Sequence, residues 1–392
     1  MKTLLKLWPL WLVTFLFASF MALTAFVNSS MLLESFGISE TALGILYSLG
    51  SVCALGFVLI LPRFFHRHMT VKSLLASILI LGSASTAGLV FLPQTPLSGS
   101  ILFVLYLMAT SAVLYLLDIV VGHYSTPGNT GVMRGWYMTI ISIAWVIAPF
   151  ASGYLIEVLG GYDIVYIIAG VLLSFAAIIV GLVYVPFSPD ESHSTTGLLS
   201  DIKAFFTNKN LRNIFMTNSL LQTFYAVMVI YSPIYLNEVI GLSWEYIGII
   251  FAIMLMAFVL FDYPLGYLAD HYIGEKEILT LGLMIMSGTT LLIAFVGEVH
   301  WLWWALLLFG TRTGAAATEM MNESFFFKHV TPDDVSFIAY YRNARPLAYI
   351  LAPLVMSFSL GVFNLETRHI FIILSVMVVL GVFWSLGLED TR

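Results

Sequence analysis

Apolar residues dominate this chain in long runs that short polar turns separate. A helix that crosses a membrane needs about 20 mostly apolar residues, and the runs are of that order. The pattern predicts twelve transmembrane helices, six in each half of the chain. We expect them over Trp8–Leu32, Ala42–Leu61, Lys72–Leu92, Gly99–Val121, Val132–Leu159, Tyr162–Val185, Asn213–Glu238, Tyr246–Tyr267, Ile278–Val296, His300–Phe326, Ser336–Phe363 and His369–Leu386.

The two halves of the chain repeat one pattern. Glu34–Ile45 and Glu238–Ile249 share a glutamate, two glycines, a serine and an isoleucine at one offset, as at Gly37 and Gly241 (241 − 37 = 204). Secondary transporters are built from such repeats, with the substrate site near the middle of the bilayer. The repeat therefore predicts two related bundles with a substrate path between them.

One long polar stretch, residues 188–212, separates the halves. It begins with Pro, Asp, Glu, Ser and Thr residues and continues as the short amphipathic segment Leu198–Phe206. We interpret it as a linker, with a helix that can lie on the membrane surface. The predicted domains are residues 1–187 and 213–392, joined by this linker.

Composition places the chain in a membrane. Of its residues, 60% are hydrophobic and 10% charged, against roughly 25% charged in a soluble domain. Lipid must cover part of such a surface. No basic stripe predicts a nucleic-acid partner, and the single cysteine, Cys53, cannot form a disulfide within the chain.

The basic residues predict the orientation. Nearly all Lys and Arg lie in loops on the side of the N-terminus, and the opposite loops carry only Arg368. Positive charge accumulates on the cytoplasmic side. We expect a multi-pass protein of a bacterial inner membrane with both termini in the cytoplasm.

The loop after the eighth predicted helix carries a recognisable motif, Gly266-Tyr-Leu-Ala-Asp270-His-Tyr-Ile-Gly274-Glu-Lys276. It resembles the Gly-x-Leu-Ala-Asp-x-x-Gly-x-Lys loop of the major facilitator superfamily. With the twelve helices and the repeat, the resemblance covers essentially the whole chain. It implies an all-α fold of two pseudo-symmetric six-helix bundles, and a cytoplasmic latch at Asp262, Gly266 and Asp270. Gly266 would permit close approach of helices.

The first half departs from that motif, because Pro62–Lys72 lacks the aspartate and the glycines. A latch here would need Arg63 and Arg67 with an acidic partner. Asp118, near the cytoplasmic end of the fourth helix, is the expected partner, because in this superfamily an acidic residue there pairs with the inner loop. Proton carriage by Asp118 and simple solvation are the alternatives.

The tenth predicted helix carries three charges on one stripe. At 100° per residue, Glu319 and Glu323 fall within 20° of Arg312. Arg312 lies 11 residues after Trp301 (312 − 301 = 11), about 16 Å along the helix and close to the midplane. Such a stripe must face the bundle interior. Arg312 could bind an anion or pair statically with Glu319, whose acid could carry the transported proton.

Glu323 lies nearer the cytoplasm, and we expect it to pair with Arg342 or Arg345 as a second latch. The first half carries Met108 and Tyr115 where the second has Arg312 and Glu319 (312 − 204 = 108; 319 − 204 = 115). We therefore place coupling in the C-terminal half.

The fifth helix contains Ala148-Pro149 and Gly153, similar to the Gly-x-x-x-Gly-Pro-x-x-Gly-Gly pattern of proton-coupled antiporters in the superfamily. Ala352-Pro353 repeats it at the same offset (353 − 149 = 204). Small residues allow close helix packing and proline bends a helix. The motif indicates either antiport or a packing device of the fold.

In this superfamily the first, fourth, seventh and tenth helices surround the central path. Asn218, Gln222 and Tyr225 share one face of the seventh helix at spacings of 4 and 7. With Asn28 and Trp145 they form a polar and aromatic lining suited to a partly apolar ligand. Helix packing is the alternative role for these side chains.

We predict a secondary transporter, working as a monomer by alternating access, that drives efflux of amphipathic compounds with the proton gradient. Uptake or exchange of an organic anion or nutrient is the alternative, because Arg312 could be the counter-ion. A transport-inactive membrane sensor of the same fold is a further one. No P-loop, catalytic motif, cofactor site or metal site is apparent, so we do not expect an enzyme.

Overall fold

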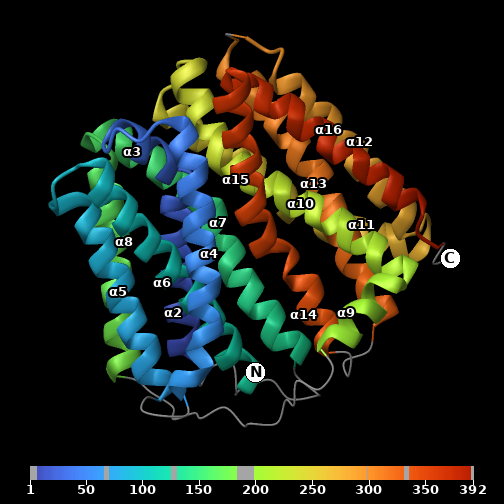
Figure 1. The fold of residues 1–392 in the computed structure, drawn as a ribbon, viewed down its shortest axis with the longest axis horizontal. Helices are drawn as coiled ribbons and strands as arrows, with labels where there is room; N and C mark the ends of the chain where they lie inside the picture. The colour runs from blue at the N-terminus through green and yellow to red at the C-terminus, as the bar shows by residue number, and fades with distance from the viewer. Residues whose placement is uncertain are drawn as a thin grey trace. The chain divides into compact units, whose positions relative to one another are not determined.

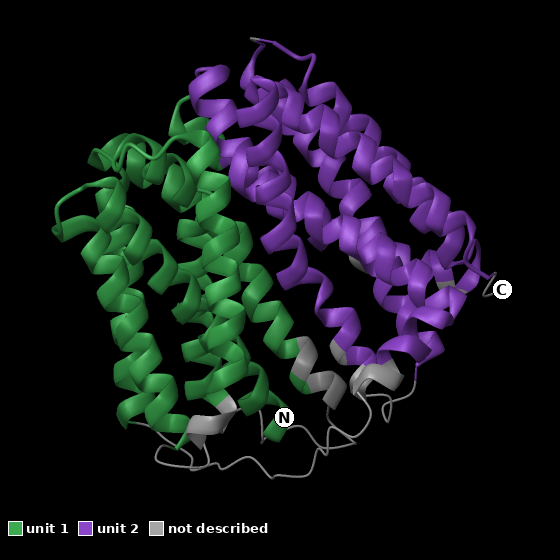
Figure 2. Cartoon of the chain, viewed as in Figure 1, with its two compact units in different colours: residues 1–192, 243–248 green, residues 193–242, 249–392 purple. Residues whose placement is uncertain are grey.

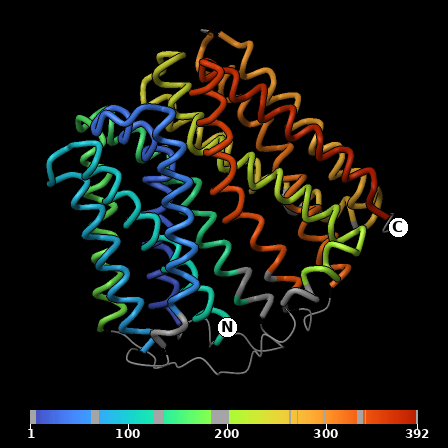
Figure 3. The backbone as a smooth tube through the Cα atoms, in the orientation of Figure 1, coloured from blue at the N-terminus to red at the C-terminus, as the bar shows by residue number. Residues whose placement is uncertain are grey.

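The computed structural model describes residues 7–65, 70–124, 130–182, 198–297, 299–330 and 335–389. Within these ranges, the side chains at 62–65, 130–132, 134–135, 198–201, 262–263, 270, 335–336 and 339 are not described. The chain forms two compact units, residues 1–192 with 243–248, and residues 193–242 with 249–392 (Figure 2). Each unit consists of helices that run up and down in succession (Figure 3).

The helices of the first unit are labelled in Figure 1. They are α2 (Trp8–Ala25), α3 (Asn28–Glu34), α4 (Glu40–Phe65), α5 (Val71–Phe91), α6 (Pro96–His123), α7 (Thr130–Leu159) and α8 (Tyr162–Leu182).

The second unit contains α9 to α16 and a short π-helix, η1. They are α9 (Leu198–Thr207), α10 (Lys209–Ile234), η1 (Tyr235–Val239), α11 (Trp244–His271), α12 (Glu275–Ile293), α13 (Trp301–His329), α14 (Val335–Arg342), α15 (Ala344–Phe363) and α16 (Thr367–Leu386). The first turn of α11, residues 244–248, packs with the first unit.

Eleven of the described helices or continuous helix pairs are long and apolar enough to cross a membrane. The exception among the long helices is α13, which has 29 residues and carries the charged stripe. Its interior face is polar, so its mean hydropathy is low although its length suffices. Eleven spans and α13 together agree with the predicted twelve.

The ends of the spans lie within four residues of the predicted ones, and two predicted spans are divided. The first apolar run divides into α2 and α3, and the eleventh divides into α14 and α15 at Asn343. The seventh span begins at Lys209, four residues before the expected Asn213, because Asn208 caps it by accepting from the amides of Asn210 and Leu211. Periodicity alone cannot locate such breaks, since the residues on both sides remain apolar.

The amphipathic segment in the predicted linker is a helix, α9. Its Phe205 is fully buried and makes edge-on ring contacts with Phe215 of α10 and with Phe337 and Tyr340 of α14. Phe205, on the apolar face of α9, is therefore covered by other helices of the second unit. Packing on protein, not only on the membrane surface, explains its amphipathic pattern.

The repeat in sequence is also a repeat in packing. In the first unit α2 packs on α7 and α8, and α5 packs on α6 and α8. In the second unit α10 packs on α15 and α16, and α12 packs on α13 and α16. These are the same four pairs under the offset of 204.

The turn that follows the first span of each half is conserved between the units in atomic detail. Gly37 and Gly241 have φ angles of 66° and 75°, in the left-handed region that favours glycine. Gly37 N–H donates to Leu33 C=O, and Gly241 N–H donates to Asn237 C=O, both at 3.1 Å. Glycine at these two positions is thus required by the turn.

Candidate functional site

Helix α13 is pressed against α12 through glycine. A Cβ atom on Gly314 would lie 2.5 Å from the backbone nitrogen of Met286 and 2.6 Å from the carbonyl oxygen of Gly282. Real Cβ contacts are essentially never that short, so the two backbones can approach this closely only without a side chain at Gly314. This contact fixes the rotation of α13 and therefore the direction of its charged stripe.

Arg312 is buried in α13 with 2% of its surface exposed. Its guanidinium carbon lies 5.3 Å from the ring centroids of both Phe224 and Tyr225 on α10. No residue in the described part of the chain forms a hydrogen bond or an ion pair with it, and its Nε is fully buried without a partner. Among the described residues, the two aromatic faces are thus the groups that lie directly against the guanidinium group.

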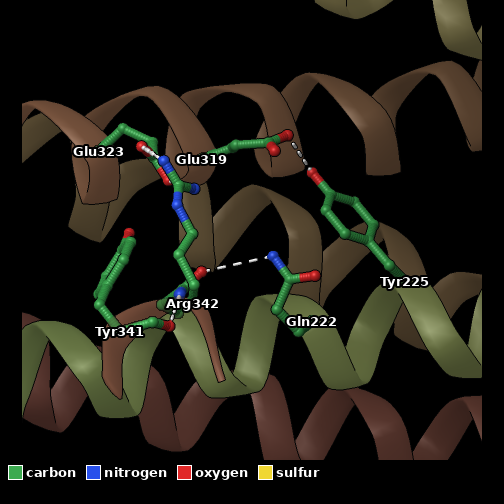
Figure 4. A network of polar contacts seen from close by, with 7 residues as sticks. Gln222, Tyr225, Glu319, Glu323, Tyr341 and Arg342 are labelled. Carbon is green, nitrogen blue, oxygen red and sulfur yellow. Dashed lines mark hydrogen bonds and ion pairs between the residues drawn. The ribbon is translucent and has the colours of Figure 1, made fainter. Parts of the chain in front are cut away.

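Glu319 lies two turns along the same stripe, half-buried (Figure 4). The hydroxyl group of Tyr225 donates a hydrogen bond of 2.7 Å to its Oε2. Arg312 and Glu319 form no ion pair within the described residues, so the static pair considered above is absent from this structure. The carboxylate is instead held by a neutral donor from the facing helix.

Glu323, one further turn along α13, binds Arg342. Arg342 Nη1 and Nη2 donate to Glu323 Oε1 and Oε2 at 2.6 and 2.9 Å, as Figure 4 shows. The predicted pairing of Glu323 is thus present, with Arg342 as the partner, whereas Arg345 is exposed at the start of α15. Its role as a latch stays a prediction.

The predicted face of α10 is present. Asn218 Nδ2 donates to the backbone carbonyl of Tyr341, and Gln222 Nε2 donates to Asn218 Oδ1, both at 3.4 Å. Tyr225 follows on the same face and reaches Glu319. Three polar residues of α10 therefore line the charged side of α13 and the end of α14.

The sequence interpretation missed three contributors to this site. Phe224 supplies one of the two rings beside Arg312. Thr217 donates to Asn322 Oδ1 at 2.7 Å, and the fully buried Nδ2 of Asn322 has no described partner. Asn322 directly precedes Glu323 in a helix expected to cross the membrane, and a polar residue at that position was a usable signal. No sequence signal pointed to Phe224, because its contact with Arg312 depends on how α10 packs against α13.

The two lining residues predicted in the first unit have local partners there. Asn28 is 4% exposed; it accepts from Tyr166 at 2.5 Å and donates to Tyr106 at 3.4 Å. Trp145 is half-buried, with its ring edge-on to Phe26 at 6.1 Å. Hydrogen bonds within the unit thus use both polar groups of the Asn28 amide, and its substrate-binding role stays a prediction.

The bend motif of the fifth span takes part in close helix packing, and its link to antiport stays a prediction. Ala148 and Pro149 are buried in α7, and the Pro149 carbonyl accepts from Ser152 Oγ at 3.0 Å. A Cβ atom on Gly153 would overlap the carbonyl oxygen of Trp244, in the turn of α11 that belongs to this unit. In the second unit, Pro353 is buried in α15.

The latch residues of the motif loop are only partly described. Asp262 and Asp270 lie in α11 at positions whose side chains are outside the described ones. A Cβ atom on Gly266 would meet only Met320 Sδ, at 3.9 Å, so no close helix approach requires glycine there, contrary to the expectation. Asp118 is exposed near the end of α6, and its expected partners Arg63 and Arg67 lie outside the described side chains.

Solved transporter structures resemble the chain over nearly its whole length. The nucleoside transporter NupG superposes with a TM-score of 0.75 at 16% sequence identity, covering 98% of each chain. A bacterial homologue of the human lysosomal transporter Spinster, inward-facing and unoccupied, gives a TM-score of 0.74 at 13% identity, covering 98% of this chain and 96% of that one. At such identities the likeness establishes the fold.

No curated protein sequence matches the chain. The profile of the Major Facilitator Superfamily matches residues 10–335. That span includes nearly all of the first unit and the second unit as far as the start of α14, with the motif loop and the whole charged stripe of α13. The members of this family are membrane transporters of small molecules rather than enzymes. By this match and by its fold, the chain belongs to the Major Facilitator Superfamily.

Proposed function

We propose that this protein is a proton-coupled secondary transporter that carries a small organic anion by alternating access. The observation that supports the proposal is Arg312, a cation buried in the second unit that has no acidic partner among the described residues. An unpaired charge at membrane depth is costly and marks a substrate or ion pathway by default. A bound anion would supply the missing counter-ion. This favours uptake or exchange of an organic anion over efflux of amphipathic compounds.

The surroundings of Arg312 support a substrate that is partly apolar. Phe224 and Tyr225 place two ring faces beside the guanidinium group. Binding sites for small molecules combine such apolar walls with a few polar groups that fix orientation. A planar aromatic carboxylate satisfies both features, since its charge meets Arg312 and its ring can stack on the same walls.

Glu319 supports proton coupling. It is an ionisable residue inside the second unit, and its carboxylate accepts only the neutral hydroxyl of Tyr225 among the described residues. A carboxyl group in this setting can take a proton from whichever side of the membrane has access and return it to the other. The Glu323–Arg342 pair nearer the cytoplasm would act as a latch between such states.

The remaining parts of the proposal follow the sequence. Residues 1–187 and 213–392 would form the two rocking domains, with 188–212 between them. The protein would work as a monomer in a bacterial inner membrane with cytoplasmic termini. The excess of Lys and Arg on one side supports this orientation.

Flux into proteoliposomes, with and without a pH gradient, tests the proposal. The panel contains benzoate, succinate, the uncharged nucleoside uridine and the cation tetraphenylphosphonium. We expect gradient-dependent flux of benzoate, and a loss of about tenfold or more in Arg312→Gln. Arg368→Gln is the matched control, because it removes an exposed arginine whose ion-pair partner is the exposed Glu366 and not a residue of the α13 stripe. Benzoate flux that Arg312→Gln leaves unchanged would contradict the proposal.

Efflux of amphipathic compounds is the second candidate. The aromatic pair Phe224 and Tyr225 favours it, because ring faces bind organic cations as well as apolar bodies. Proton-driven export of tetraphenylphosphonium, without benzoate flux, would select it. Uridine flux would instead match the substrate named for NupG. Binding of any panel member without flux would indicate a sensor of the same fold.

A further inference from the structure

Tyr225 contacts both functional groups of the α13 stripe. Its ring centroid lies 5.3 Å from the guanidinium carbon of Arg312, and its hydroxyl group donates to Glu319 at 2.7 Å. Arg312 and Glu319 are seven residues apart, about 10 Å along the helix, and no ion pair within the described residues joins them. Tyr225, on the facing helix α10, is therefore the shared partner of the two.

The two contacts use different parts of the side chain. The face of the ring attracts the guanidinium group, whereas the hydroxyl group at its tip binds the carboxylate. A tyrosine side chain is rigid beyond its two rotatable bonds. A movement of the ring away from Arg312 therefore moves the hydroxyl group relative to Glu319.

We propose that Tyr225 couples anion binding at Arg312 to protonation of Glu319. This inference rests on the proposed function, and it assigns the coupling to one hydroxyl group. An anion that binds the buried guanidinium group takes the place of the Tyr225 ring beside it, and the shifted ring then stacks on the bound anion. The hydroxyl group then leaves Oε2, and Glu319 loses its one described donor.

Charge determines the direction of the coupling. The incoming anion adds a negative charge to a buried site that already contains a carboxylate, and two negative groups in a medium of low dielectric constant repel each other. A proton from water on Glu319 removes that repulsion. Anion binding is thus accompanied by proton uptake, and by linkage a proton on Glu319 strengthens anion binding by the same factor.

Other charged or titratable groups face this region and must be considered. Glu323 lies on α13 itself, and Arg342 of α14 holds both of its carboxylate oxygens. Arg345 and Tyr349 of α15 also act on the stripe electrostatically. None of these four donates a hydrogen bond to Glu319 within the described residues. A change confined to the Tyr225 hydroxyl group therefore isolates the proposed step.

Two adjacent aromatic residues provide matched variants. Tyr225→Phe keeps the ring beside Arg312 and removes the hydroxyl group. Phe224→Leu removes the other ring beside Arg312 and leaves the Tyr225–Glu319 hydrogen bond in place. Both are made in the full chain, and thermal unfolding in detergent confirms that each variant folds.

Titration calorimetry with benzoate, in buffers of different ionisation enthalpy, measures the protons taken up per anion. We expect about one proton in the wild type and less than about half of one in Tyr225→Phe, because Glu319 of the variant lacks its donor and already holds a proton before the anion binds. Phe224→Leu should weaken benzoate binding by about three- to tenfold and keep the wild-type proton uptake. The infrared carboxyl band that Glu319→Gln abolishes should shift in Tyr225→Phe, because the hydrogen bond to it is lost.

The outcomes separate this inference from the proposed function. Tyr225→Phe with wild-type proton uptake would overturn the inference while benzoate transport stands. Equal losses of proton uptake in both variants would also overturn it, because the effect would then belong to the aromatic wall as a whole. A wild type that does not bind benzoate would refute the proposed substrate class, and with it the inference.

Discussion

The guanidinium group of Arg342 binds both carboxylate oxygens of Glu323, at 2.6 and 2.9 Å. Glu323 ends the charged stripe of α13, and Arg342 is the last residue of α14. The contact therefore joins α13 to α14, the next helix along the chain. Parallel hydrogen bonds of this kind add geometric specificity to the charge attraction.

Removal of this pair should affect transport more than stability. The side chains of Arg342 and Glu323 are 54% and 33% exposed, so the pair contributes only about 0–1 kcal/mol to folding. We expect Arg342→Ala to unfold within a few degrees of the wild type but to alter the flux rate several-fold. Thermal unfolding and proteoliposome flux measure the two effects.

The charge-swapped double variant, Glu323→Arg with Arg342→Glu, is the control. It should restore flux toward the wild-type rate, because the ion pair is re-formed with reversed polarity. Double-variant flux no better than that of either single variant would mean that the pair has no part in gating.

Glu319→Gln should separate substrate movement from proton movement. Glutamine keeps an oxygen that can accept from Tyr225 but cannot exchange a proton. A gradient of one pH unit supplies about 1.4 kcal/mol, enough for tenfold accumulation. We expect this accumulation to disappear in the variant, together with the pH dependence of flux, while exchange of labelled substrate at equal pH persists.

Glu323→Gln is the matched control for that experiment, since it removes the neighbouring carboxylate and leaves the Tyr225–Glu319 contact intact. It should retain gradient-driven accumulation. If Glu319→Gln also accumulates substrate normally, Glu319 is only a packing partner of Tyr225.

Gly314 and Gly266 should respond differently to the same substitution. A methyl group on Gly314 would meet the Met286 nitrogen at 2.5 Å, so Gly314→Ala should destabilise the second unit by about 1–3 kcal/mol. Gly266→Ala meets only the flexible end of Met320 and should be neutral or slightly stabilising, because alanine favours helix. Chemical or thermal unfolding in detergent compares them. Equal stability would show that α12 and α13 are not packed as described.

Asn28 should be required for the stability of the first unit. Its Oδ1 accepts from the buried hydroxyl group of Tyr166, so Asn28→Ala leaves that donor unpaired and should cost about 1–3 kcal/mol. The double variant Asn28→Ala with Tyr166→Phe removes both partners and should recover part of the loss. A loss of substrate binding with unchanged stability would instead support the predicted role in the lining.

Much of the site could be predicted from the sequence, because it depends on the spacing of residues within single helices. The spacing of Arg312, Glu319 and Glu323 places them on one stripe whatever surrounds α13, and the spacing of Asn218, Gln222 and Tyr225 does the same on α10. The partners of these groups were harder to predict from the sequence. Arg312 and Glu319 appeared able to pair, yet Glu319 binds Tyr225 and Arg312 faces two rings.

The sequence by itself determined the number of membrane spans, the twofold repeat and the glycine turns, because each depends on local composition or on local backbone geometry. The left-handed turns at Gly37 and Gly241 are the clearest case. Only the tertiary structure decided that Asn28 binds tyrosines, that Gly314 and not Gly266 fits a close helix contact, and that Arg312 has no acidic partner in the described chain. These outcomes depend on the rotation and distance of neighbouring helices, which packing of the whole unit sets.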